Sequence, residues 1–366
     1  MRKVLVFKET LLPTSETFIL AQMTALKRYE ARLCGLERWV PSLPLRSDTL
    51  FLTNSASKYA AVRAKLYRHT GIAPKLHQQV SEFGPDLIHA HFVDGGLTAT
   101  HMAQQLKIPL LVTIHGGDIT VRAGRSDMYK RLSDQTGLVI CVSEFIREQA
   151  LEAGFSPEKL IVHHIGIDRE HFALSAPLEA SKRILFIGRL VEKKGCEYLL
   201  RAMQLVQEQH PDAELTILGD GPLRPEMEAL AAELKIHCEF PGFQPAAVVR
   251  DTLQKTRLVC VPSVTAANGD SEGLPTVIAE AQAMGIPVVA SIHAGIPEIL
   301  CDGETGILAP ERDFRGLAEG MSLLLGDEAM WQRFHVAALA RIAEHFDLKK
   351  QTALLEDIYT QVADKR

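Results

Sequence analysis

The sequence predicts an α/β protein with two domains, each a doubly wound parallel sheet covered by helices. Short apolar runs alternate with longer amphipathic stretches along the whole chain, which is the pattern of βαβ units. The pattern lapses around Pro177 and then restarts, and 366 residues suit two ordinary domains better than one. The expected parts are an N-terminal domain over 1–170, a linker over 171–182, a C-terminal domain over 183–345, and a final helix over 346–366 that crosses back to the N-terminal domain.

The first half contains six short apolar runs that read as strands, with amphipathic stretches between them. The predicted strands are 3–7, 31–36, 86–91, 110–114, 138–142 and 160–164. The predicted helices are 15–29, 58–69, 97–106 and 144–152.

The second half repeats this alternation and ends in two helical stretches with no strand between them. Its predicted strands are 184–187, 214–218, 238–240, 258–261 and 288–290. Its predicted helices are 195–209, 222–234, 245–254, 275–284, 314–325, 328–345 and 349–363. Because the last two cannot extend a parallel sheet, we expect them to cover one.

Polar and glycine-rich segments follow several predicted strands. In doubly wound sheets, ligands bind outside the carboxyl ends of the strands. The segments in question are 8–15, 115–118, 188–189 and 219–221. We expect the two sheets to face each other and to gather these segments around one cleft.

Glu272 and Glu280 are separated by seven residues, between two apolar strand-like runs. On a helix that starts near Leu274, Glu280 lies on the second turn and Glu272 stays in the preceding loop. Backbone N–H groups at such a helix start are unpaired and attract anions. This arrangement suits a sugar nucleotide, because the carboxylates can accept hydrogen bonds from its hydroxyl groups and the backbone amides can bind its phosphates.

A basic turn follows the first strand of the second half. Gly188 ends that strand, and Arg189 and Lys194 can then converge at the start of the next helix. A planar guanidinium and a mobile ammonium together suit a diphosphate. The alternative is an ordinary basic surface turn. The turn containing Gly221 is expected to let a nucleotide approach the backbone, with its base near Phe243.

Histidines end two strands of the first half. His115 precedes a glycine pair, so it is either a catalytic residue or a satisfied histidine, and Asp118 either orients it or meets an acceptor. His89 and His91 alternate at a strand end, but no third ligand follows at metal spacing, which favours packing histidines over a metal pair. We expect no metal site.

Composition excludes several classes of protein. The chain is 46% hydrophobic and 23% charged, and it contains no apolar run near the ~20 residues of a membrane span. The N-terminus shows no secretory signal, and the six cysteines form no Cys-x-x-Cys pair, so we expect a reducing, cytoplasmic setting. Residues 1–83 carry 13 Lys+Arg against 6 Asp+Glu, which indicates either an anionic membrane or nucleic-acid surface or a solvated helix face. We expect no nucleic-acid partner.

The motifs together resemble one large enzyme family. Several segments of the second half look like the retaining GT-B-fold glycosyltransferases of the glycogen-synthase-like and mannosyltransferase-like group, of family 4 type. These segments are Gly188-Arg189-Leu190 with Lys194-Gly195, 219–222, 261–263, 272–281 and 285–290. Segments 13–19, 88–92 and 113–116 resemble a branch that serves bacterial surface and exopolysaccharide assembly. The resemblance implies two Rossmann-like domains facing across a cleft.

The resemblance also implies roles for individual residues. Arg189 and Lys194 would bind the donor diphosphate, Glu280 the ribose hydroxyls and Glu272 the transferred sugar, with His115 beside the anomeric centre. His91 and Asp118 would lie on the acceptor side. Such enzymes need no cofactor and no divalent metal, and the sequence contains no Asp-x-Asp.

Two positions depart from the family pattern. Where many relatives have a second glycine, this chain has Pro275, which lacks an N–H. The remaining donor contacts are expected from Gly273, Leu274, Thr276 and Val277. A Gly-Gly pair after the first strand is also absent, and Ser15 as a helix N-cap is expected to serve the phosphates instead.

The function expected from this resemblance is transfer of a hexose-type sugar from a nucleoside diphosphate to an acceptor with retention, by front-face attack. The acceptor is expected to be a saccharide or a lipid-linked saccharide, met by the N-terminal domain at the inner face of the membrane. Alternatives on the same fold are a nucleotide-sugar epimerase, a sugar phosphorylase and a non-catalytic nucleotide-sugar-binding module.

Overall fold

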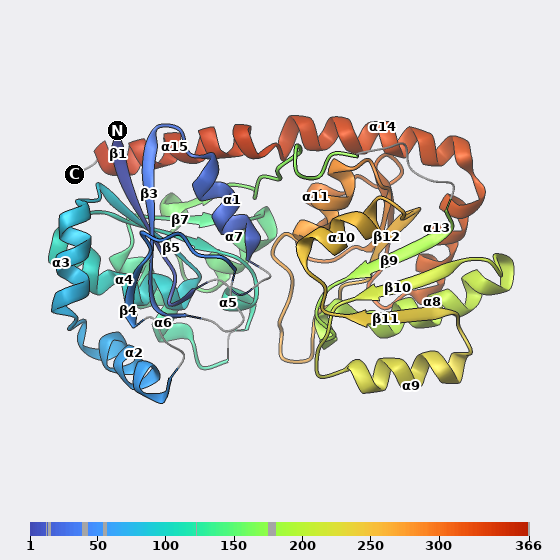
Figure 1. Cartoon of the computed structure of the whole chain (residues 1–366), viewed down its shortest axis with the longest axis horizontal. Coiled ribbons are helices and arrows are strands. Elements are labelled where there is room, and N and C mark those ends of the chain that lie inside the picture. The colour runs from blue at the N-terminus through green and yellow to red at the C-terminus, as the bar shows by residue number, and fades with distance from the viewer. Residues whose placement is uncertain are drawn as a thin grey trace. The chain divides into compact units, whose positions relative to one another are not determined.

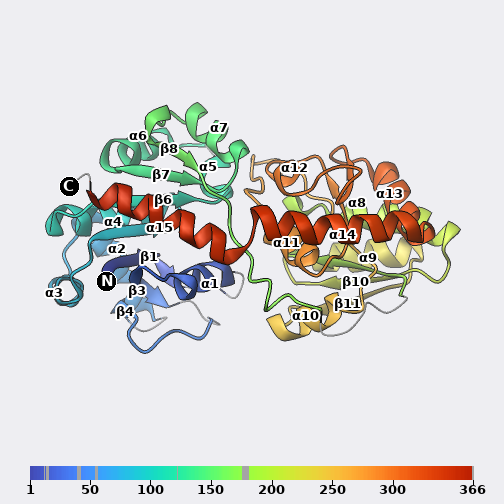
Figure 2. The same cartoon turned by 90° about the horizontal axis from the view of Figure 1, so that it is seen from above.

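The computed structural model describes residues 1–11, 13, 16–38, 43–53, 57–121, 123–174 and 181–364. The chain forms two compact units, one of Met1–Gly166 with Leu348–Arg366 and the other of Ile167–Asp347. Each unit is a parallel sheet with helices packed on its faces (Figures 1 and 2). The predicted α/β class with two doubly wound sheets is therefore confirmed. Pro177, at the centre of the predicted linker, and Ser15 lie outside the described residues.

The sheet of the first unit has eight strands in the order β2-β3-β1-β5-β6-β7-β8, with β4 paired to β3, and all its pairings are parallel. Its strands are β1 (Arg2–Phe7), β2 (Thr10–Leu11), β3 (Tyr29–Arg38), β4 (Leu50–Thr53), β5 (Leu87–His91), β6 (Leu110–Ile114), β7 (Leu138–Cys141) and β8 (Leu160–Val162). Its helices are α1 (Thr17–Ala25), α2 (Lys58–Thr70), α3 (Pro74–Phe83), α4 (Val93–Leu106), α5 (Gly117–Thr120), α6 (Ser126–Gln135), α7 (Glu144–Glu152), the 3₁₀ turn η1 (Pro157–Lys159) and α15 (Leu348–Asp364). The C-terminal helix α15 packs against α1 and β5 and places Leu355 and Tyr359 in the core.

The sheet of the second unit has six parallel strands in the order β11-β10-β9-β12-β13-β14, so the strand order reverses between β9 and β12. Its strands are β9 (Arg183–Ile187), β10 (Glu214–Leu218), β11 (Cys238–Gly242), β12 (Leu258–Val261), β13 (Val288–Ser291) and β14 (Gly306–Ala309). Its helices are η2 (Glu192–Lys194), α8 (Cys196–Gln209), α9 (Arg224–Leu234), α10 (Ala246–Leu253), α11 (Thr276–Ala283), α12 (Ile296–Ile299), α13 (Phe314–Gly326) and α14 (Glu328–His345). Buried side chains of α8 and α13 pack on β9, β10 and β12 in one core. A point of strand-order reversal is where doubly wound sheets bind ligands.

The predicted helix over 15–29 is too long. Helix α1 ends at Ala25, and Tyr29 already belongs to β3. The backbone N–H groups of Lys27, Arg28 and Tyr29 donate to the buried carboxylate of Glu356, on α15. A continuing helix would use those N–H groups for its own carbonyls, so a contact from the far end of the chain ends it.

Several short elements were not predicted, notably β2, β4 and β14 and helices α3, α5, α6 and α12. They contain between two and ten residues, so their apolar patterns are too short to stand out. In the described part of the chain, no helix combines the length and apolarity that crossing a bilayer requires.

Candidate active site

Two tight turns meet at the carboxyl ends of β9 and β10. Gly219 has φ of +147°, and a Cβ there would lie 1.8 Å from the carbonyl oxygen of Gly188. Only glycine allows this approach, so the two turns pack backbone against backbone. Arg189, next to Gly188, is exposed and makes no hydrogen bond or ion pair with any described residue through its guanidinium. Gly221 continues the second turn, where its N–H bonds to Asp220 Oδ1 at 2.7 Å.

Lys194 and Glu272 form an ion pair, with 2.7 Å between Nζ and Oε1. Lys194 ends η2, directly before α8, and Glu272 lies in the loop between β12 and α11. Burial alone would raise the pKa of the Glu272 carboxyl, but the charges of Lys194 and Lys193 outweigh burial and hold it below its ordinary value. The structure thus brings together two of the predicted donor residues, and the lowered pKa keeps the Glu272 carboxyl ionised at neutral pH.

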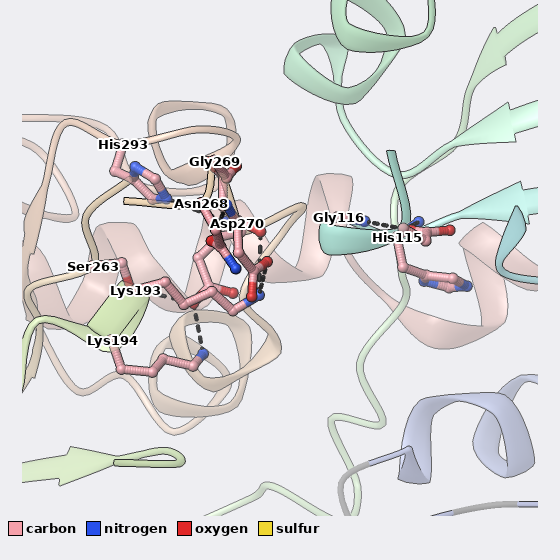
Figure 3. A network of polar contacts seen from close by, with 12 residues as sticks. His115, Gly116, Lys193, Lys194, Ser263, Asn268, Gly269, Asp270 and His293 are labelled. Atoms are coloured by element: carbon pink, nitrogen blue, oxygen red, sulfur yellow. Dashed lines mark hydrogen bonds and ion pairs between the residues drawn. The ribbon is translucent and has the colours of Figure 1, made fainter. Parts of the chain in front are cut away.

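Lys193 fixes the loop that carries Glu272. Its ammonium pairs with Asp270 at 2.9 Å and donates to the carbonyl of Ser271 at 3.2 Å (Figure 3). Its own carbonyl accepts from the N–H of Val264 at 2.8 Å, near the start of the loop. The two adjacent lysines therefore have different roles, because Lys193 fixes the loop and Lys194 pairs with the carboxylate of Glu272.

His293 links the same loop to the end of β14. The Glu272 N–H donates to His293 Nε2 at 3.2 Å, so that nitrogen is the acceptor and Nδ1 carries the proton. Nδ1–H then donates to Glu311 Oε1 at 2.6 Å, and Thr265 donates to Glu311 through its N–H and its hydroxyl. Burial opposes ionisation of Glu311, but these donors hold its pKa below the ordinary value. Sequence reasoning missed this relay, although His293 follows β13 at the sheet edge where ligands bind.

Replacing His293 with alanine should weaken donor binding more than it slows turnover. The substitution leaves the Glu272 N–H and Glu311 without their shared partner, which should cost about 1–3 kcal/mol of stability and loosen the Glu272 loop. We expect the donor KM to rise about tenfold, as in cases where a positioning contact is lost. His335→Ala is the control, because His335, on α14, also makes a side-chain hydrogen bond, from Nδ1 to the carbonyl of Gly285 at 2.7 Å. An equal KM rise in both variants would show a general loss of stability instead.

Glu280 lies on α11 and is partly buried. Burial raises the pKa of its carboxyl to about 7, although a hydrogen bond from Thr276 favours the charged form. Pro275 is the N-cap of this helix and supplies no side-chain cap. The N–H groups of Thr276 and Val277 have no hydrogen-bond partner among the described residues, so they are available to an anion.

Donor affinity should depend on pH through Glu280. If ribose hydroxyls donate to its carboxylate, binding requires the ionised form, so affinity for a nucleotide sugar should rise with pH up to about 7 and then level off. Below that pH, one proton must leave on binding, which gives a slope of up to about tenfold per pH unit. Because the pKa is raised in the fold, ionisation also makes the free protein less stable as pH rises toward 7. Glu280→Gln should remove both trends and weaken binding, as measured by calorimetry between pH 5.5 and 8.

The other predicted donor residues lie at the same edge of the second sheet. Gly273 and Leu274 are buried, ahead of α11, and Phe243 is exposed just after β11. Of the predicted set, the structure joins Lys194 to Glu272 by an ion pair, whereas neither Arg189 nor Glu280 forms a hydrogen bond or ion pair with either of them. Their roles toward a donor stay predictions.

His115 lies among aromatic rings in the first unit. Its Nε2 and His91 Nδ1 are 3.1 Å apart, and its ring centroid is 4.5 Å from that of Phe92. Burial, with the nearby charges of His89 and Lys8, lowers the pKa of His115 to about 3. The ring is therefore neutral at physiological pH, and its Nδ1 has no partner among the described residues.

Asp118 holds the turn that carries His115. Its carboxylate accepts from the backbone N–H groups of Val93 at 3.1 Å, His115 at 3.1 Å and Gly116 at 2.8 Å. Burial raises the pKa of Asp118, although these three bonds favour its charged form. This geometry fits a residue that orients His115, and a contact of Asp118 with an acceptor stays a prediction.

His89 is a packing histidine, as the sequence favoured. Its Nδ1 lies 2.7 Å from the hydroxyl of Tyr359, and its Nε2 lies 2.7 Å from that of Thr113. Both ring nitrogens are therefore bonded within the protein. His91 lies beside it, with buried Nε2 lacking a partner among the described residues.

Comparison with known proteins places the chain in a family. The family model "Glycosyltransferase Family 4" matches residues 26–171, and "Glycosyl transferases group 1" matches residues 167–341. The chain is 32% identical over 291 residues to the amylovoran biosynthesis glycosyltransferase AmsK of Erwinia amylovora, covering 77% of this chain and 71% of that protein. It is 29% identical over 357 residues to the putative colanic acid biosynthesis glycosyltransferase WcaL of Escherichia coli (strain K12), covering 84% and 87%.

Solved structures share the fold at lower sequence identity. HepE of Anabaena, crystallised with UDP and glucose, superposes with a TM-score of 0.78 at 18% identity, covering 98% of this chain and 99% of that one. Sucrose-phosphate synthase from Thermosynechococcus elongatus superposes with a TM-score of 0.80 at 19% identity, covering 100% of both chains. The chain therefore belongs to the family 4 glycosyltransferases, and its fold is the GT-B fold.

Proposed function

We propose that this glycosyltransferase moves a hexose-type sugar from a nucleoside diphosphate to an acceptor with retention at the anomeric carbon. The observation that carries the proposal is the ion pair of Lys194 and Glu272, buried at the carboxyl edge of the second sheet. The ammonium can bind the phosphate oxygens of such a donor, and the carboxylate beside it can accept hydrogen bonds from the sugar hydroxyls. HepE, which shares the fold, was crystallised with UDP and glucose.

Charge development explains how these residues would act. As the bond between sugar and phosphate breaks, negative charge grows on the diphosphate, where Lys194, Arg189 and the free amides of α11 stabilise it without a metal. Glu272 then holds the sugar as positive charge grows near its anomeric carbon. We favour front-face attack, with a phosphate oxygen taking the acceptor proton. The placement of His115 beside the anomeric carbon stays a prediction.

We further propose that the acceptor is a lipid-linked saccharide in exopolysaccharide assembly, on the cytoplasmic side of the membrane. AmsK and WcaL, which align with most of this chain, carry names from amylovoran and colanic acid biosynthesis. The basic excess in residues 1–83 supports a contact with an anionic surface.

A thermal-stabilisation screen tests the donor class. Uridine, guanosine and adenosine diphosphate sugars should be compared, because a ligand that binds only the folded state raises the unfolding midpoint. One base should stabilise the protein, and chelator should leave both stabilisation and transfer unchanged. If no nucleotide sugar stabilises the chain, the proposed function is wrong. The anomeric configuration of the product, read by NMR, then tests retention.

A further inference from the structure

Helix α2 exposes a row of large apolar side chains. Tyr59, Val62 and Leu66 are 68%, 66% and 57% exposed, and their spacing places them on one face of the helix. The opposite face packs inward through small side chains and Tyr67. The helix runs along the outside of the first unit (Figure 1). An exposed apolar row of this kind marks an interaction surface.

The segment that carries this row is rich in basic residues and contains no acidic residue. Residues 49–81 contain five Lys and Arg and no Asp or Glu. Arg68 pairs with Glu9 and Glu37, but the other four make no ion pair with any described residue. The unpaired cations are Lys58, Arg63, Lys65 and Lys75. The guanidinium of Arg63 lies 5.8 Å from the ring centroid of Tyr59, so charge and apolar surface are directly adjacent.

A hollow adjoins the exposed row. It has a volume of about 680 Å³ and lies among β4, α2 and α3. Its lining includes Arg63, Lys75, Phe51 and the exposed Ile72. Two cations together with several apolar side chains in the lining of this hollow match a phosphate attached to a hydrocarbon.

We propose that this surface, made of Tyr59, Val62, Leu66 and Ile72 with the four cations, lies on an anionic phospholipid bilayer. The apolar side chains would enter the interface, while the long stems of the lysines carry their ammonium groups to lipid phosphates. The inference deepens the proposed function, because a lipid-linked acceptor is held at such a bilayer. A second copy of the chain fits poorly, since a two-fold contact would oppose the unpaired cations of one copy with those of the other.

Vesicle sedimentation with the full chain tests the proposal. The protein should bind vesicles of phosphatidylcholine with phosphatidylglycerol, bind pure phosphatidylcholine weakly, and lose affinity as salt rises. Val62→Glu with Leu66→Glu should weaken binding at least tenfold. Leu354→Glu is the matched control, because Leu354 is 52% exposed on α15 of the same unit. Lys58→Gln and Lys65→Gln should each cost about fivefold, whereas Lys130→Gln on α6 should cost nothing.

The outcomes separate this proposal from the proposed function. The α2 variants touch no predicted donor residue, so their stabilisation by a nucleotide sugar should match that of the wild type. Failure of the donor screen overturns the proposed function, whereas equal vesicle binding by wild type and α2 variants overturns the bilayer surface. Ultracentrifugation supplies another decisive result, since self-association that the α2 variants abolish, without vesicle binding, would make this face an interface between copies.

Discussion

Replacing Lys194 with methionine should reduce kcat/KM for sugar transfer by about 10²–10³-fold. Methionine keeps much of the side-chain volume but removes the charge that faces Glu272 at 2.7 Å and, in the proposed reaction, the leaving diphosphate. The loss should fall mainly on kcat if the ammonium acts chiefly on the charge that develops in the transition state. Initial rates with the donor identified by thermal stabilisation would measure it. Turnover at the wild-type rate would remove Lys194 from the catalytic set.

The same substitution should also destabilise the fold, because it leaves a buried carboxylate without its main counter-charge. We expect a loss of about 3 kcal/mol at neutral pH. Lys194 holds the pKa of Glu272 below its ordinary value of 4.5, so that stabilisation exists above about pH 4.5 and is lost as pH falls and the carboxyl protonates. The stability difference between wild type and variant should therefore shrink in acid.

A double variant separates the structural effect from the chemical one. Lys194→Met with Glu272→Gln contains no unpaired buried charge, so most of the lost stability should return. Activity should stay low, because the diphosphate still lacks its cation. Recovery of both stability and activity would mean that the ion pair serves only the fold.

The meeting of Lys194 and Glu272 was predictable because it follows from a general rule. Both residues follow strands of one parallel sheet, and carboxyl ends of parallel strands lie at the same edge. The sequence features that indicated a binding site there were the glycine after β9, Gly188, and the two glutamates, Glu272 and Glu280. The fold class was predictable in the same way, from alternating apolar runs long enough to recognise.

The His293 relay was not predictable from pattern alone. Its partner Glu311 comes just after β14, a four-residue strand whose apolar pattern is too short to recognise. The different roles of Lys193 and Lys194 could not be predicted either, because two adjacent lysines look the same in a sequence. The end of α1 was mistaken because a carboxylate more than 300 residues away sets it. Each of these features depends on tertiary contacts between segments that are distant in the sequence, so local patterns could not predict it.

Gly195→Ala should destabilise the second unit by about 3 kcal/mol or more and lower its unfolding midpoint by roughly 6–12 °C. Gly195 lies between Lys194 and α8 with φ of +61°, and a Cβ there would be 1.9 Å from the carbonyl oxygen of Pro262. The atoms that clash belong to the backbone of Pro262, so no flexible side chain can move aside to relieve the contact. The turn must therefore shift, which would also displace Lys194 and reduce transfer.

Gly303→Ala is a matched control for the clash. Gly303 belongs to the same unit and has a similar φ of +72°, but a Cβ there meets no atom within 4 Å. It should show only the cost of a left-handed conformation, about 1 kcal/mol and roughly 2–4 °C, with activity unchanged. The difference between the two variants then isolates the contact of Gly195 with Pro262. Equal shifts of the unfolding midpoint for both variants would show that the turn before α8 can relax. The close approach of Gly195 to Pro262 would then not be what fixes the position of Lys194.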